Sequence, residues 1–165
     1  MKLEGTGLIN IALNNWLKKY GFKARVRGVD TDFYWYYDDT ISYSFFFENE
    51  AAENWYALFE ELGCQYDVEL FFTAFLHELG HSCTYWNFEE EEINEHEEMK
   101  RLIEEEPSTF ADNLHYVYTH LPVEYTATKW AVDYINSYPE RVKELVNIVS
   151  KTVAIFYKIN DVKDN

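Results

Sequence analysis

The most constraining part of this chain is residues 67–85, where an apolar helical pattern carries two histidines and a glutamate. The apolar side chains recur at three- and four-residue spacing, and Asp67 is a suitable N-terminal cap. A helix this apolar is buried in a folded domain, and buried imidazole and carboxyl groups need partners. The sequence therefore predicts a central buried helix over residues 67–85 whose polar side chains converge on a common partner.

These polar side chains belong to the string His77-Glu78-Leu79-Gly80-His81. Each helical residue turns by about 100°, so His77 and His81 project from one face, one turn apart. Two imidazoles in this arrangement can bind one zinc ion. Glu78 points to the side, where its carboxylate can take a proton from a water activated at the ion. The alternative is a pair of hydrogen-bonded core histidines without a metal.

Gly80 is unusual in this helix, because glycine costs about 1 kcal/mol relative to alanine in a helix interior. A glycine kept at that cost indicates a close approach to the backbone. We therefore expect another segment of the chain to pass close to the helix at Gly80.

A catalytic zinc site normally has three protein ligands and one open position, so a third ligand is needed. The best candidate is Glu124, just inside the start of a helix predicted over residues 123–136. Ala127, Thr128 and Ala131 follow at i+3, i+4 and i+7, and they are small enough to let this helix approach the histidines closely. The other interpretation of Glu124 is a surface carboxylate that interacts with the helix dipole.

The rest of the pattern predicts a mostly helical α+β fold, in which a small three-stranded antiparallel sheet packs on the histidine-bearing helix. Strands are predicted over residues 23–29, 33–37 and 41–47. Further helices are predicted over residues 8–20, 50–62, 91–105 and 123–136, and from Pro139 onward, with a break at Pro107. A length of 165 residues fits one domain covering residues 1–165, and no linker or repeat divides it.

The net charge of −16 has much of its excess in residues 89–106. This balance argues against binding nucleic acid through phosphates, which needs clustered lysine and arginine. The simplest interpretation of the acidic segment is a solvated face; the alternative is a surface that mimics nucleic acid or attracts a basic partner.

The start of the chain shows no secretory signal, and its apolar stretches are shorter than a membrane span. We therefore expect a cytoplasmic protein with no membrane association. Cys64 and Cys83 are interpreted as buried small residues rather than as a disulfide, and Cys83 is expected to face away from the two imidazoles.

Other polar residues near the two motifs are weaker candidates. One of the side chains that precede Glu124 can stabilise the oxyanion formed when water attacks a carbonyl; these are His115, Tyr116, Tyr118 and His120. Asp133 is either an acceptor for a ligand histidine or a solvated carboxylate. His96 lies on the acidic helix, in its less polar stripe, and is predicted to be a surface residue.

The two motifs together resemble the ImmA/IrrE-type small zinc metallopeptidases. The likeness covers roughly residues 41–135, and its specific part is His77-Glu-Leu-Gly-His81 with Glu124-x-x-Ala127-x-x-Trp130-Ala131. The run from Leu121 also resembles small phage-encoded proteins. The resemblance implies a zincin core with His77, His81 and Glu124 as zinc ligands and Glu78 as general base. It also implies that an edge strand, here residues 41–47, aligns an extended substrate.

The chain departs from this family in three features. It lacks a recognisable helix-turn-helix domain, it carries the acidic insertion at residues 89–106, and it has a long C-terminal helix. The expected function is a zinc-dependent metallopeptidase that cleaves a peptide bond in a specific protein or peptide substrate. The alternative is a catalytically silent, acidic binding protein with the zincin fold, used by a phage or mobile element to act on a host or regulatory protein.

Overall fold

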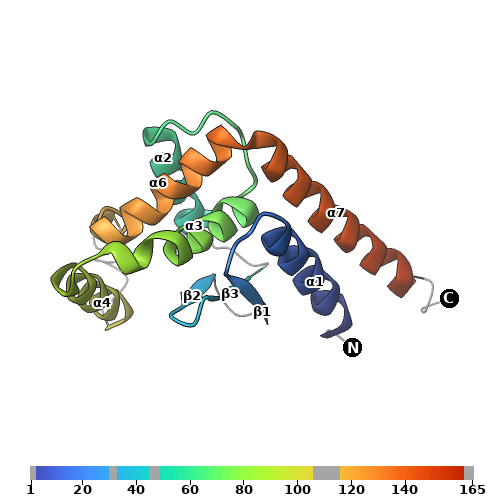
Figure 1. Cartoon of the computed structure of the whole chain (residues 1–165), viewed down its shortest axis with the longest axis horizontal. Helices are drawn as coiled ribbons and strands as arrows, with labels where there is room; N and C mark the ends of the chain where they lie inside the picture. Colours follow the sequence, from blue (N-terminus) through green and yellow to red (C-terminus); the bar gives the residue numbers. More distant parts are fainter. Residues whose placement is uncertain (1–2, 30–32, 45–48, 106–115, 162–165) are drawn as a thin grey trace.

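The centre of the computed structural model is the contact between helix α3 (Leu70–Thr84) and helix α6 (Pro122–Ser137). Ala127 and Ala131 of α6 are fully buried there, and such small side chains let the two helices pack closely. A small sheet lies on the other side of α3 (Figure 1). The structure describes residues 3–29, 33–44, 49–105 and 116–161.

Three short strands form the sheet: β1 (Arg25–Val29), β2 (Tyr34–Tyr36) and β3 (Thr40–Tyr43). Their order is β1-β3-β2, with β3 parallel to β1 and antiparallel to β2. The sheet is therefore mixed, and the prediction of an antiparallel sheet is wrong for the β1–β3 pair. All four residues of β3 are buried. A strand covered on both faces belongs in the middle of a sheet, where both of its edges are hydrogen-bonded.

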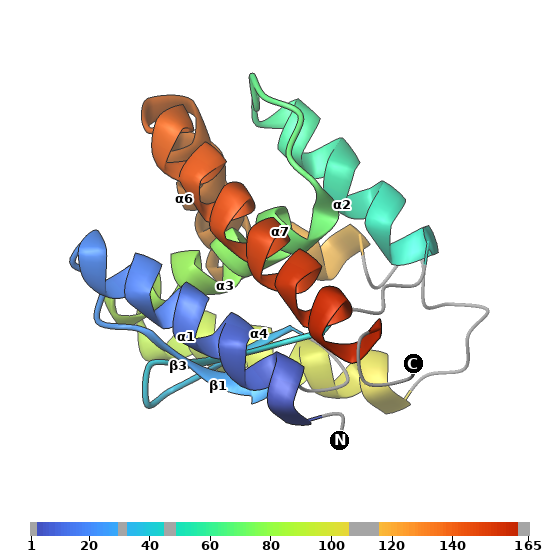
Figure 2. The same ribbon diagram turned by 90° about the vertical axis from the view of Figure 1, so that its right-hand side faces the viewer.

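The remaining helices surround this centre. They are α1 (Leu3–Lys19), α2 (Asn49–Glu61), the 3-10 helix η1 (Tyr85–Asn87), α4 (Glu90–Glu105) and α7 (Pro139–Asp161), with a helical turn at 116–119. Helices α1 and α7 lie side by side and run in opposite directions (Figures 1 and 2). The indole N–H of Trp16 in α1 donates to the carbonyl of Arg141 in α7 at 3.0 Å, which joins the two helices at the core.

The predicted helices are all found, and the mostly helical α+β class is confirmed. Helix α1 begins at Leu3, earlier than the predicted residue 8, and α3 begins at Leu70 after Glu69 rather than behind a cap at Asp67. The backbone N–H of Gln65 donates to Asn136 of α6 at 2.9 Å, and Val68 is buried in the core. These contacts hold the preceding segment in a non-helical conformation. The predicted strand residues 45–47, the break at Pro107 and His115 lie outside the described residues.

Two smaller expectations concern cysteines and membranes. Cys83 is exposed and Cys64 is half-buried, so the prediction that both are buried is wrong; both are free thiols. Among the described helices, none is both long enough and apolar enough to cross a membrane.

Candidate metal centre

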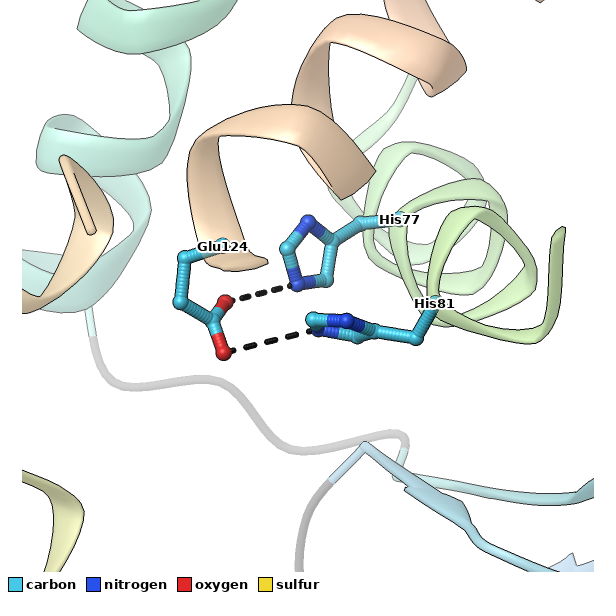
Figure 3. Close-up of side chains that lie close together, drawn as sticks. All are labelled: His77, His81 and Glu124. Atoms are coloured by element: carbon cyan, nitrogen blue, oxygen red, sulfur yellow. Dashed lines mark ion pairs between the residues drawn. The ribbon is translucent and has the colours of Figure 1, made fainter. Parts of the chain in front are cut away.

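The two histidines of α3 face Glu124 in the first turn of α6 (Figure 3). Nε2 of His77 lies 3.0 Å from Oε2 of Glu124, and Nε2 of His81 lies 3.5 Å from Oε1. The three residues are only 2, 6 and 3% exposed, respectively. The interpretation of Glu124 as a surface carboxylate is therefore wrong. The structure brings the three predicted ligands together from two helices that are far apart in the sequence.

The spacing of the three donor atoms fits a single metal ion. One ligand atom from each residue lies within 4.8 Å of the other two. Two ligands of a tetrahedral zinc ion, each about 2.0–2.1 Å from it, are about 3.3–3.4 Å apart. The separations of 3.0 Å for His77 and 3.5 Å for His81, each to one of the two oxygens of Glu124, are close to that value. Two imidazoles and a carboxylate are also a donor set that zinc commonly takes in catalytic sites.

Thr128 determines how His77 presents its ring. Its hydroxyl donates to the backbone carbonyl of Glu124 at 3.0 Å, so it accepts from Nδ1–H of His77, also at 3.0 Å. This arrangement directs the Nε2 lone pair of His77 at the carboxylate of Glu124. A lone pair and a carboxylate oxygen 3.0 Å apart repel unless a cation lies between them. That cation is either a second ring proton or a metal ion.

The electrostatics of these buried side chains favour a positive charge at this point. Burial alone would lower the pKa of His81, but the charge of Glu124, its hydrogen bond and the charge of Glu78 together outweigh burial and raise that pKa. Burial alone would raise the pKa of Glu124, but the charge of His81 and hydrogen bonds from His77, His81 and His96 hold it well below its usual range. Within the described residues, Nδ1 of His81 has no hydrogen-bond partner.

Glu78 lies beside the ligand cluster and is half-buried. It also receives a hydrogen bond from the backbone N–H of Trp35 in β2. Burial raises its pKa, and the charge of Glu124 adds to this, against the lowering effects of His77, His81 and the Trp35 amide. Glu78 therefore lies between the metal-binding face of α3 and strand β2.

Two tryptophans pack against the ligand histidines. The ring of Trp55 in α2 meets the His77 ring edge-on at 4.3 Å between centroids, and the ring of Trp35 stacks on His81 at 6.1 Å. Asp39, in the turn between β2 and β3, accepts hydrogen bonds from Ser82 of α3 at 2.9 Å and from the indole of Trp35 at 3.3 Å. The sheet is therefore attached to α3 directly beside the ligands.

The strand that borders the centre is not the one expected to align a substrate. The predicted strand at residues 41–47 corresponds to β3, which lies between β1 and β2. A strand in that position has both edges occupied within the sheet, so the assignment of β3 as substrate guide is wrong. The edge strand that contacts α3 is β2, which carries Trp35.

His96 is the functional candidate that sequence reasoning missed. Its side chain is only 6% exposed, so the prediction that His96 is a surface residue is wrong. Its Nε2 lies 2.6 Å from Oε1 of Glu124. The signal that predicts burial is its place in the stripe of Ile93, Lys100 and Ile103, at helical spacing on the acidic helix.

The weaker site candidates from the sequence differ in whether they reach the metal centre. Tyr118 reaches the centre, with its hydroxyl 2.9 Å from Nε2 of His96. Tyr116 is 63% exposed, and the ring of His120 lies tilted against it at 4.2 Å between centroids rather than meeting the ligands. Asp133 is exposed and pairs with Lys129 at 2.9 Å, which confirms its interpretation as a solvated carboxylate.

Comparison of the chain with protein-family models, with curated proteins and with solved structures gives no match.

Proposed function

We propose that this chain is a zinc-dependent metallopeptidase of the kind its two motifs resemble. The observation that supports this most directly is the buried group of His77, His81 and Glu124, with Glu78 beside it on α3. A zinc ion bound there would supply Lewis-acid activation of water and of a peptide carbonyl. The proposed substrate is a specific protein or peptide.

The residues of the chain have separate tasks in this proposal. His77, His81 and Glu124 hold the ion, with the ring of His77 oriented by Thr128. Glu78 accepts the proton of the attacking water and passes it to the leaving amine when the peptide bond breaks. Because its carboxylate already contacts the backbone of β2, a substrate strand lying along that edge would bring its carbonyl near Glu78.

Substitution of Glu78 by glutamine tests the proposal. The amide keeps the size of the side chain but cannot accept the proton, so Glu78→Gln should abolish cleavage and leave zinc bound at one ion per chain. Cleavage is measured by mass spectrometry on a complex peptide mixture, and zinc by elemental analysis. A matched control is Glu95→Gln, an exposed glutamate of α4 that should retain full activity. Full activity in Glu78→Gln would refute the assignment.

The alternative is a binding protein that keeps the zincin arrangement without catalysis. The observation that favours it is the burial of the ligands, which are at most 6% exposed, under an acidic helix. Metal analysis separates the two functions. If the purified protein carries no stoichiometric zinc and His77→Ala leaves thermal stability unchanged, the enzyme proposal fails and the acidic binding protein is favoured.

A further inference from the structure

His96 lies on the most acidic helix of the chain, yet it points inward. Helix α4 carries glutamates at most of its exposed positions, while the His96 side chain is 6% exposed and meets Glu124 of α6. Its ring stacks on the ring of Tyr118 at 5.2 Å between centroids and 25° between planes. A buried imidazole on such a helix has a specific partner, and here that partner is a proposed metal ligand.

The contact between His96 and Glu124 is a hydrogen bond from nitrogen to oxygen. The two atoms, Nε2 and Oε1, are 2.6 Å apart, and a ring lone pair and a carboxylate at that distance would repel. Nε2 therefore carries a proton and donates it to Oε1. The hydroxyl of Tyr118 lies 2.9 Å from the same Nε2, which places a second polar group beside this contact.

His96 is outside the ligand group itself. Among the described residues, the donor atoms that lie within 4.8 Å of one another belong to His77, His81 and Glu124. The bond from His96 is made to Oε1, which also lies 3.5 Å from Nε2 of His81, while Oε2 lies 3.0 Å from Nε2 of His77. The carboxylate is thus held on one oxygen by a donor from α4, and both of its oxygens face ligands of α3.

Helix α4 is anchored so that this donor keeps its place. One turn after His96, the ammonium group of Lys100 donates to the hydroxyl of Tyr34 at 2.6 Å. Tyr37 donates to Glu97 at 2.7 Å. Both tyrosines come from β2 and the turn that follows it, so α4 is tied to the same sheet that contacts α3.

We propose that His96 is a positioning residue of the metal centre, which holds Oε1 of Glu124 so that the carboxylate stays oriented toward the ion shared with His77 and His81. This inference rests on the metal site of the proposed function but not on peptidase activity. Hydrogen bonds that orient a metal ligand typically contribute 10- to 100-fold to metal affinity. The residue acts through Glu124 and needs no contact with the substrate.

The test compares two replacements of His96 that differ in one property. His96→Leu fills the space without a donor, whereas His96→Gln restores an N–H donor. We expect the zinc dissociation constant, measured by competition with a chelator, to rise about 10- to 100-fold in His96→Leu and to recover substantially in His96→Gln. His120→Leu, at a histidine near Glu61 and away from the centre, should bind zinc like the unmodified chain.

A second measurement separates orientation from packing. The cobalt-loaded His96→Leu variant should show an altered visible absorption spectrum, while chelator-treated His96→Leu keeps its helical circular dichroism. Equal zinc affinity in His96→Leu and the unmodified chain would overturn the proposal. Complete loss of binding in both His96 variants, equal to His77→Ala, would also overturn it, because His96 would then be a ligand. If the unmodified chain binds no zinc, this inference and the proposed function both fail. Equal zinc affinity in His96→Leu and the unmodified chain overturns this inference alone and leaves the proposed function intact.

Discussion

Gly80, whose side chain is a single hydrogen atom, allows α3 and α6 to pack closely. A Cβ added to Gly80 would lie 2.4 Å from the backbone oxygen of Ala127, a distance that real Cβ atoms do not show. The close approach expected at Gly80 is therefore confirmed, and the approaching segment is the helix that carries Glu124. Because the obstacle is backbone, it cannot move aside as a flexible side chain would.

Gly80→Ala should consequently destabilise the protein, by about 1–3 kcal/mol, although alanine is the better helix former. The reason is that α6 must move away from α3, which also separates Glu124 from the histidines and weakens zinc binding. Urea unfolding of chelator-treated protein measures the stability. Gly7→Ala is the matched control, since nothing lies within 4 Å of its added Cβ in α1 and stability should rise slightly. Equal stability of Gly80→Ala and the unmodified chain would contradict this account.

At the scale of elements, α1 and α7 are joined across more than a hundred residues of sequence. The ammonium group of Lys19 and the hydroxyl of Tyr20 both donate to the Glu144 carboxylate at 2.6 Å. These hydrogen bonds lower the pKa of Glu144 below its ordinary value of 4.5. A lowered pKa means that the contact stabilises the fold above about pH 4.5 and is lost as the pH falls through the folded-state pKa.

Glu144→Gln should therefore lower the melting temperature slightly near neutral pH, because the contact is exposed. The difference from the unmodified chain should shrink once the pH falls below about 4.5. Thermal unfolding from pH 3 to pH 8, followed by circular dichroism, measures both. Lys19→Met should give a similar loss at neutral pH. A difference that is constant down to pH 3 would show that Glu144 acts by packing rather than by charge.

At the scale of the whole molecule, the net charge of −16 opposes the folded state. Folding brings the carboxylates of a 165-residue chain close together, and their repulsion acts over about 30 Å at 0.01 M salt but only about 10 Å at 0.1 M. The ion pairs in α4, such as Arg101 with Glu98 at 2.6 Å, are exposed and offset little of this repulsion.

The melting temperature of the chelator-treated protein should therefore rise as sodium chloride is raised from 0.01 to 0.3 M. Glu95→Lys, at an exposed site of α4, changes the net charge from −16 to −14. This variant should melt higher at low salt and respond less to added salt. Differential scanning fluorimetry is sufficient for the comparison. A melting temperature that falls with salt would mean that favourable ion pairs outweigh the net repulsion.

The sequence by itself determined the properties that depend on the local spacing of residues. Helical periodicity places His77 and His81 on one face, and it also identifies the helices to within a few residues. The small residues after Glu124 indicate a close helix–helix contact, and Gly80 indicates that some segment passes close to its own helix, which the structure identifies as α6. These patterns carry over into the structure because burial of one face of each element requires them.

The tertiary structure alone decided how the strands pair and which further side chains reach the centre. The parallel pairing of β1 with β3 depends on how the chain returns to the sheet after β2, which no single strand pattern contains. The inward position of His96 depends on how α4 is anchored to the sheet, and the orientation of His77 depends on Thr128 in another helix. Hydrogen bonds between distant elements follow from the packing of the whole core, because side chains far apart in sequence become neighbours only after it forms.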